Sequence, residues 1–232
     1  VVEVTVREAR GVPVLAGTGS NSTAATIGRT RMARELGAAG ALVVVPYYNK
    51  PMQEGLILHF KAVADATSLP IVLYNIPGRT GRNMEPSTVK RLVADPLFIG
   101  IKEASGNMDS VSTLVATCGE HFSVLSGDDS LSLPMYALGA KGVIATTGNV
   151  SPGLMSVIWH KFEAGDLAEA RECHYKLRGL FNSLFIESNP APLKYALSLM
   201  GMMRNELRLP LAPVNPATEH AVREGLKEAG LL

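Results

Sequence analysis

The sequence predicts an α/β protein of the TIM (β/α)8 barrel class, with about six βα units followed by a C-terminal helical extension. Short apolar runs that end in glycine or polar residues alternate with helical patterns at intervals of roughly 25 residues, which indicates parallel βαβ units. The unusual polar and aromatic residues follow strand ends, and a barrel gathers all such ends around one mouth. An open doubly wound sheet also fits the alternation, but no strand is followed by the G-x-G-x-x-G pattern of a dinucleotide site. We expect a barrel portion at residues 1–165 and a helical extension at residues 166–232.

Six apolar runs are predicted to be strands, because short apolar runs bounded by turn residues are typical of strands buried on both faces. In chain order they cover residues 12–17, 41–45, 70–74, 98–102, 122–126 and 142–146. Helical patterns follow them at residues 23–36, 53–67, 86–92, 109–117, 130–138 and 151–164. Asn21 or Ser22 is expected to cap the first of these helices, and Gly37 to end it.

The last part of the chain is predicted to be purely helical. The three helices expected there cover residues 167–184, 191–200 and 216–229. Pro210 and Pro213 interrupt the stretch before the last helix, so we interpret that stretch as a connector.

Composition narrows the classes of function. The formal net charge of +1 gives no reason to expect a nucleic-acid partner. No apolar run reaches the roughly 18 residues of a transmembrane helix, so we expect a soluble protein without a membrane partner. Cys118 and Cys173 cannot form a disulfide framework and fit a reducing compartment, the cytoplasm. No histidine or cysteine cluster has the spacing of a metal site, so none is expected.

Lys102 is the first candidate for chemistry. It ends the apolar run that begins at Phe98, and a small, polar turn with Gly106 follows. Its ammonium is expected to be partly desolvated there, which favours the neutral amine. A neutral amine can attack a carbonyl carbon and form a Schiff base. The alternative is a lysine that bends outward into water, as most lysines do.

Three further side chains are expected at the same mouth. Tyr74 ends the preceding strand, about 5 Å from the lysine strand, and a phenol can shuttle protons; Tyr48 follows an earlier strand. Arg79 suits bidentate capture of a carboxylate. Packing roles for the tyrosines and a surface role for the arginine are the alternatives. Asp128 and Asp129 fit either a metal site or a helix cap, and the cap is favoured.

At these residues the sequence resembles the pyruvate-dependent class I aldolases, the family of dihydrodipicolinate synthase and N-acetylneuraminate lyase. The matching stretches extend over nearly the whole chain, and they are specific only in combination. They are Tyr74-Asn75-Ile76-Pro77-Gly78-Arg79-Thr80, Gly100-Ile101-Lys102-Glu103-Ala104, Pro46-Tyr47-Tyr48-Asn49, Leu125-Ser126-Gly127-Asp128-Asp129 and Asn189-Pro190-Ala191-Pro192-Leu193-Lys194. Arg79 favours the synthase branch, because the sialate lyases usually lack that arginine.

The resemblance implies a lyase reaction on a lysine Schiff base. Lys102 would hold pyruvate covalently, and Tyr74 would relay protons to it. Tyr48 would belong to the same relay and reach across a dimer interface into the partner's site. The enamine of pyruvate would then attack the aldehyde of aspartate semialdehyde, without a metal or organic cofactor.

The resemblance also implies the binding residues and the assembly. Arg79 would bind the carboxylate of aspartate semialdehyde, and Gly127 and the carbonyl of Ile144 would line the pyruvate pocket. The assembly would be a homotetramer built from tight dimers. A sibling aldolase that cleaves sialic acid or a keto-deoxy sugar acid, and a non-catalytic truncated barrel, are the alternatives.

Two departures from the family pattern are expected to matter. The family's Gly-Thr-Thr-Gly-Glu loop is not in this sequence, which begins with valine, so we expect that two N-terminal βα units are missing from it. Asn21 and Tyr47 match residues that the family uses for feedback inhibition by lysine. Ala25 stands where sensitive members have a glutamate, so strong inhibition is not expected.

Overall fold

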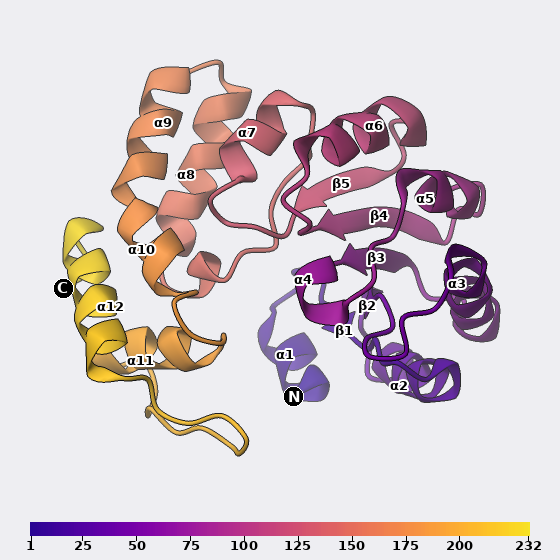
Figure 1. The fold of residues 1–232 in the computed structure, drawn as a ribbon, viewed down its shortest axis with the longest axis horizontal. Coiled ribbons are helices and arrows are strands. Elements are labelled where there is room, and N and C mark those ends of the chain that lie inside the picture. Colours follow the sequence, from indigo (N-terminus) through magenta and orange to yellow (C-terminus); the bar gives the residue numbers. More distant parts are fainter. The chain divides into compact units, whose positions relative to one another are not determined.

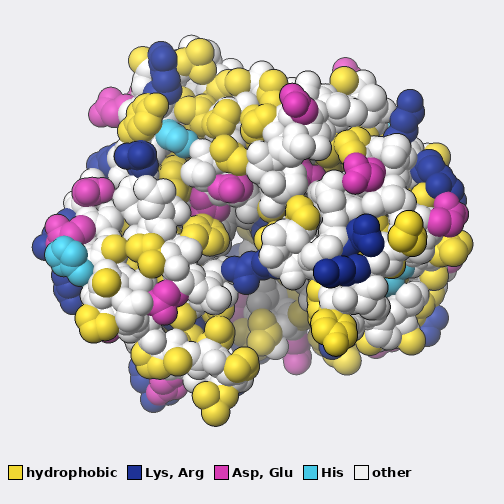
Figure 2. Space-filling model, in the orientation of Figure 1, with side chains coloured by type: hydrophobic (Ala, Val, Ile, Leu, Met, Phe, Trp, Pro, Cys, Tyr) yellow, Lys and Arg dark blue, Asp and Glu magenta, His cyan; other side chains and the backbone are white.

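The computed structural model describes residues 1–232 and divides into two compact units. The first comprises residues 1–127 and 138–141, and the second comprises residues 128–137 and 142–232. The expected division at residue 165 stays a prediction. In the face of the molecule that Figure 2 shows, acidic and basic side chains are interspersed over both units, without a continuous basic area.

The first unit contains a five-stranded parallel sheet in which the strands follow their order in the chain. The strands are β1 (Leu15–Gly17), β2 (Gly40–Val44), β3 (Ile71–Asn75), β4 (Phe98–Glu103) and β5 (Ser123–Ser126). An order without a reversal is that of a (β/α) barrel wall, because a doubly wound sheet reverses its strand order at a switch point. Five of the six predicted strands are therefore confirmed, and the barrel interpretation is preferred on topology.

Helices connect these strands and cover one face of the sheet. The helices of the first unit are α1 (Val2–Glu8), α2 (Thr23–Glu35), α3 (Gln53–Thr67), α4 (Pro77–Thr80), α5 (Pro86–Leu92) and α6 (Met108–Cys118). Figure 1 shows α2, α3, α5 and α6 side by side on the same side of the sheet. Ser22 caps α2 by accepting a hydrogen bond from the Ala25 amide, as predicted. The one-turn helix α4 lies between β3 and α5, where no helix was predicted.

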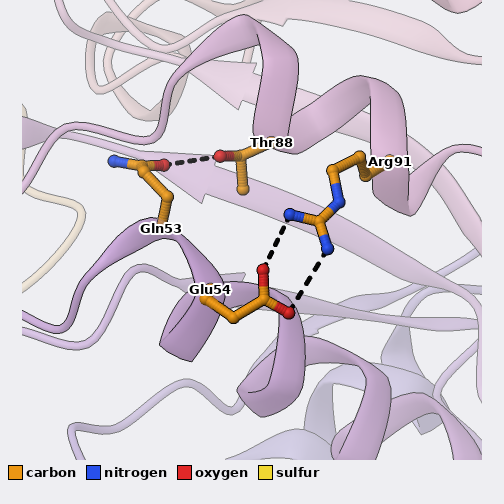
Figure 3. A network of polar contacts seen from close by, with 4 residues as sticks. All are labelled: Gln53, Glu54, Thr88 and Arg91. Carbon is orange, nitrogen blue, oxygen red and sulfur yellow. Dashed lines mark hydrogen bonds and ion pairs between the residues drawn. The ribbon is translucent and has the colours of Figure 1, made fainter.

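Polar contacts join α3 to α5 (Figure 3). The Thr88 hydroxyl donates to Gln53 Oε1 at 2.6 Å, and the Arg91 guanidinium donates to both carboxylate oxygens of Glu54 at 2.8 and 3.3 Å. The arginine lowers the pKa of the Glu54 carboxyl. Both members of this ion pair are exposed, so the pair sets geometry more than it adds stability.

The second unit is helical. Its elements are α7 (Ser132–Ala137), a 3-10 turn η1 (Thr147–Asn149), α8 (Pro152–Glu163), α9 (Leu167–Lys176), α10 (Arg178–Ser183), α11 (Ala191–Leu199) and α12 (Pro216–Glu228). The helix predicted at residues 167–184 is thus two helices that meet at Leu177. At the contact of α10 with α12, a Cβ on Gly179 would lie 3.0 Å from the Cα of Gly225, so only glycine permits this close crossing. No helix of the chain combines the length and apolar character needed to cross a membrane.

The strand predicted at residues 142–146 is wrong. Only Val143 makes an isolated bridge, and no ladder forms. At the end of this stretch the physical reason lies in Asp129, which is 1% exposed: its carboxylate accepts hydrogen bonds from the amides of Thr146 at 3.0 Å and Thr147 at 2.5 Å. These amides are bonded to a side chain and cannot join a strand ladder, and η1 begins at the second of them. The cap interpretation of the aspartates is supported, since Asp128 also accepts from the amide of Ser130.

Candidate active site

The ends of β3 and β4 bring Tyr74 and Lys102 together. The two residues are direct neighbours in the parallel register, and Lys102 Nζ lies 4.3 Å from the centroid of the Tyr74 ring. A cation at this distance over a phenol face is attracted by the ring electrons. Both side chains are half-buried, so the lysine does not extend into bulk water.

Gly127 gives the lysine its space. It directly follows β5, and its amide donates to the carbonyl of Glu103 at 2.7 Å. A Cβ at this position would lie 2.9 Å from Lys102 Cε and 2.7 Å from the Cβ of Ala104. Because carbon atoms normally stay about 3.5–4.0 Å apart, only glycine leaves the lysine chain in this place.

A cavity of about 380 Å³ opens beside Tyr74. Its lining residues come from the ends of β1, β2 and β3 and from α4: Gly17, Gly19, Leu42, Val44, Tyr47, Tyr74, Ile76, Arg79 and Thr80. Burial raises the pKa of the Tyr74 phenol, and the positive charge of Arg79 partly offsets that rise. The cavity therefore combines apolar walls, a phenol that stays protonated at neutral pH, and a guanidinium at its edge.

The loop after β2 carries the other two tyrosines. Tyr47 lines the cavity, whereas Tyr48 is 88% exposed and has a left-handed backbone with φ of 73°. This chain alone therefore does not bury the Tyr48 phenol against Lys102. The side-chain amide of Asn49 donates to the carbonyl of Asn21 at 2.9 Å, so Asn21 lies against the same loop.

Thr18 and Ile144, which follow or lie in predicted strands, have different surroundings. Thr18, at the end of β1, is buried, and its hydroxyl is 2.8 Å from that of Thr30, which indicates a structural role. Ile144 belongs to the second unit, in the stretch that forms no ladder. No group of three or more histidine, cysteine, aspartate or glutamate side chains is arranged to hold a metal ion.

Sequence reasoning missed a buried polar pair next to the lysine. Asn75 and Glu103 are 1% and 2% exposed, and the Asn75 amide donates to Glu103 Oε2 at 2.9 Å. Burial raises the pKa of the Glu103 carboxyl, while hydrogen bonds from Ser105 and Asn75 lower it. The signal was present in the spacing, because each of the two residues directly follows one member of the Tyr74 and Lys102 pair.

Comparison with known proteins gives consistent matches. Residues 1–229 match the family model described as the Dihydrodipicolinate synthetase family. The 4-hydroxy-tetrahydrodipicolinate synthases of Thermodesulfovibrio yellowstonii and Geobacter sp. strain M21 are 48% and 51% identical to this chain. Each match covers 100% of this chain and 80% of the relative.

Solved structures agree with these matches. Dihydrodipicolinate synthase from Thermotoga maritima has a TM-score of 0.97 to this chain at 44% identity. The chloride-inhibited enzyme from Acinetobacter baumannii, complexed with pyruvate, has a TM-score of 0.97 at 42% identity. Each covers 100% of this chain, which spans 80% of either. The predicted fold class, a TIM (β/α)8 barrel followed by C-terminal helices, is confirmed, whereas the sheet has five strands and not the predicted six.

Proposed function

The chain belongs to the dihydrodipicolinate synthetase family, and we propose that it condenses pyruvate with L-aspartate 4-semialdehyde to give 4-hydroxy-tetrahydrodipicolinate. The observation that supports this function best is the contact between Lys102 Nζ and the Tyr74 ring at the end of adjacent strands. This places an amine and a proton donor side by side at the rim of the sheet, which is the pair that Schiff-base chemistry needs.

The reaction starts on Lys102. Its ammonium first loses a proton, and the neutral amine attacks the keto carbon of pyruvate and forms a carbinolamine, which loses water to give an iminium ion. Loss of a methyl proton produces the enamine, whose carbon attacks the aldehyde of the second substrate. The amine of that substrate then attacks the iminium carbon, closes the ring and releases the lysine. The iminium is the electron sink, so these steps use no metal or organic cofactor.

Tyr74 moves the protons of these steps. Because burial raises the pKa of its phenol, the hydroxyl is protonated at neutral pH and can donate to the carbinolamine oxygen as water leaves. Tyr48 is the second member of this relay. In one chain its phenol is exposed, so its role requires that it enters the site of a partner copy.

The partners follow from this role. We assign a homotetramer built from tight dimers, in which the loop after β2 completes the neighbouring site. One of the similar solved structures is described as a monomeric variant, and sedimentation of this chain distinguishes a tetramer from a monomer. The location that fits a biosynthetic enzyme with two free cysteines is the cytoplasm.

Substrate recognition is assigned to three residues. Arg79 on α4, at the edge of the cavity, binds the carboxylate of aspartate semialdehyde as a bidentate pair. Gly127, beside Lys102, lines the pyruvate pocket, and the carbonyl of Ile144 is assigned to pyruvate binding from the family resemblance alone. Lysine, the end product of the route, would bind near Asn21 and Tyr47, and it inhibits weakly because Ala25 cannot supply a carboxylate.

A substrate panel tests the function. The purified protein is given pyruvate with aspartate semialdehyde, with N-acetylmannosamine, or with a sugar aldehyde, and consumption of pyruvate is followed. Turnover with the semialdehyde alone is expected, and turnover with only a sugar would contradict the proposal. Arg79→Ala should lower kcat/KM for the semialdehyde on the order of 100-fold and leave Schiff-base formation with pyruvate intact. Arg91→Ala on the outer surface makes the same chemical change away from the cavity and is the matched charge control.

A further inference from the structure

We propose that Asn75 and Glu103 are positioning residues, which hold Tyr74 and Lys102 in register from the opposite face of the sheet. This inference rests on the proposed function, because it assigns a role in presenting the same lysine. Neither side chain touches the substrate. Both act through the backbone of β3 and β4, on which the reacting groups are mounted.

The register of the two strands places the pairs back to back. Tyr74 is opposite Lys102, and one residue further Asn75 is opposite Glu103. Successive side chains in a strand point to opposite faces, so the second pair lies on the other face of the same two strands. The hydrogen bond from Asn75 Nδ2 to Glu103 Oε2, 2.9 Å long, directly links the strands at the point where the catalytic pair sits.

The pair also fixes the segments that leave the strands. Asn75 Oδ1 accepts from the amide of Met84 at 3.0 Å, and Asn75 Nδ2 donates to Asn83 Oδ1 at 2.9 Å. Glu103 Oε1 accepts from the amide of Ser105 at 2.7 Å. Each oxygen of the two side chains thus accepts a bond, and the one amide nitrogen donates two. Any shift of one strand against the other would break several of these bonds together.

A role in stability alone fits this pair poorly. Glu103 is a carboxylate at 2% exposure, and its hydrogen bonds come from amides and not from a cation. Burying a charge without a cation is costly, and apolar residues of similar size would fill the space at less cost. A carboxylate and an amide add specificity, because their hydrogen bond forms in only one register of the two strands.

Transposing the two groups tests the proposal. Asn75→Asp places two buried carboxylates against each other, and Glu103→Gln places an amide nitrogen against the donors that surround it. The double variant Asn75→Asp/Glu103→Gln exchanges carboxylate and amide, so a donor again faces an acceptor across the strands. Glu54→Gln makes the same chemical change on the surface of the same unit and serves as the matched control.

The readouts are kcat, KM for pyruvate, and the rate at which borohydride traps pyruvate on Lys102. Circular dichroism measures the folded fraction of each variant. Each single variant is expected to lower kcat and the trapping rate on the order of tenfold or more per folded molecule, while KM changes little. The double variant should recover both to within about threefold. The control should behave as the wild type.

Several results would overturn the inference. Single variants that melt earlier but keep the wild-type kcat would show that the pair only stabilises the fold. A folded double variant that stays as slow as the singles would also refute it. If these variants do not fold, Asn83→Ala decides, because it removes one acceptor of the Asn75 amide: a severalfold lower kcat supports the proposal, and an unchanged kcat refutes it. Failure of the wild type to trap pyruvate would instead refute the proposed function.

Discussion

Replacing Gly127 with alanine is expected to displace Lys102 and to lower kcat/KM on the order of 100-fold. The added Cβ would lie 2.9 Å from Lys102 Cε, 3.0 Å from Lys102 Cγ and 2.7 Å from Ala104 Cβ. Relief of these contacts requires shifts of about 1 Å, since carbon atoms normally stay about 3.5–4.0 Å apart. The Ala104 methyl group is fixed to the backbone, so the lysine chain must move, and its amine leaves the position over the Tyr74 ring.

The magnitude follows from this displacement. A misplacement of about 1 Å at a reacting group costs on the order of 100-fold in rate, or about 2.7 kcal/mol of transition-state stabilisation. Overpacking is expected to reduce the free energy of unfolding by about 1–3 kcal/mol as well. The backbone of Gly127 is not in the left-handed region, so the contacts alone are responsible.

Steady-state kinetics with both substrates and a thermal melt separate these two effects. Gly28→Ala is the control, because a Cβ at Gly28 meets nothing within 4 Å on the exposed side of α2. That variant should keep full activity and be up to about 1 kcal/mol more stable, because alanine favours helix. A Gly127→Ala protein with wild-type kcat/KM would refute the reasoning about the space around the lysine.

Two further predictions concern a buried histidine and the exposed tyrosine. His59 is 6% exposed, its Nδ1 lies 2.9 Å from the Thr23 hydroxyl, and burial lowers its pKa to about 4. This folded-state pKa lies below the ordinary value near 6.5, so the unfolded chain takes up the proton first, and the free energy of unfolding should fall by up to about 3 kcal/mol as the pH drops from about 6.5 towards 4. Denaturant titrations of the wild type and His59→Gln at several pH values check this. The same dependence of stability on pH in both proteins would contradict it. Tyr48→Phe should lower kcat about 10- to 100-fold in the assembled oligomer without changing the melting temperature. Sedimentation confirms the assembly, and an unchanged kcat would exclude the relay.

The sheet and the lysine could be predicted because their signals are local. An apolar run that ends in a lysine needs only its own sequence to indicate a buried strand with an amine at its end. The contact with Tyr74 then follows from the rule that consecutive strands in βαβ units are neighbours. The register confirms this contact to the residue.

The features that were missed depend on partners distant in the chain. The strand expected at residues 142–146 does not form a ladder, and at its end a carboxylate at Asp129, earlier in the chain, holds the amides of Thr146 and Thr147. Asn75 and Glu103 looked like ordinary polar residues at strand ends, and only the register shows that they face each other. One strand considered alone does not indicate the pair, which follows only when the predicted Tyr74–Lys102 pairing is extended by one residue along both strands.

Covalent trapping of pyruvate is the most direct test of the central claim. The purified protein is incubated with pyruvate, reduced with borohydride and digested, and the peptides are weighed by mass spectrometry. The account predicts that the mass of a reduced three-carbon adduct appears on Lys102, and that Lys102→Arg abolishes it. An unmodified Lys102 in protein that turns over both substrates, or an adduct on a different lysine, would contradict the account.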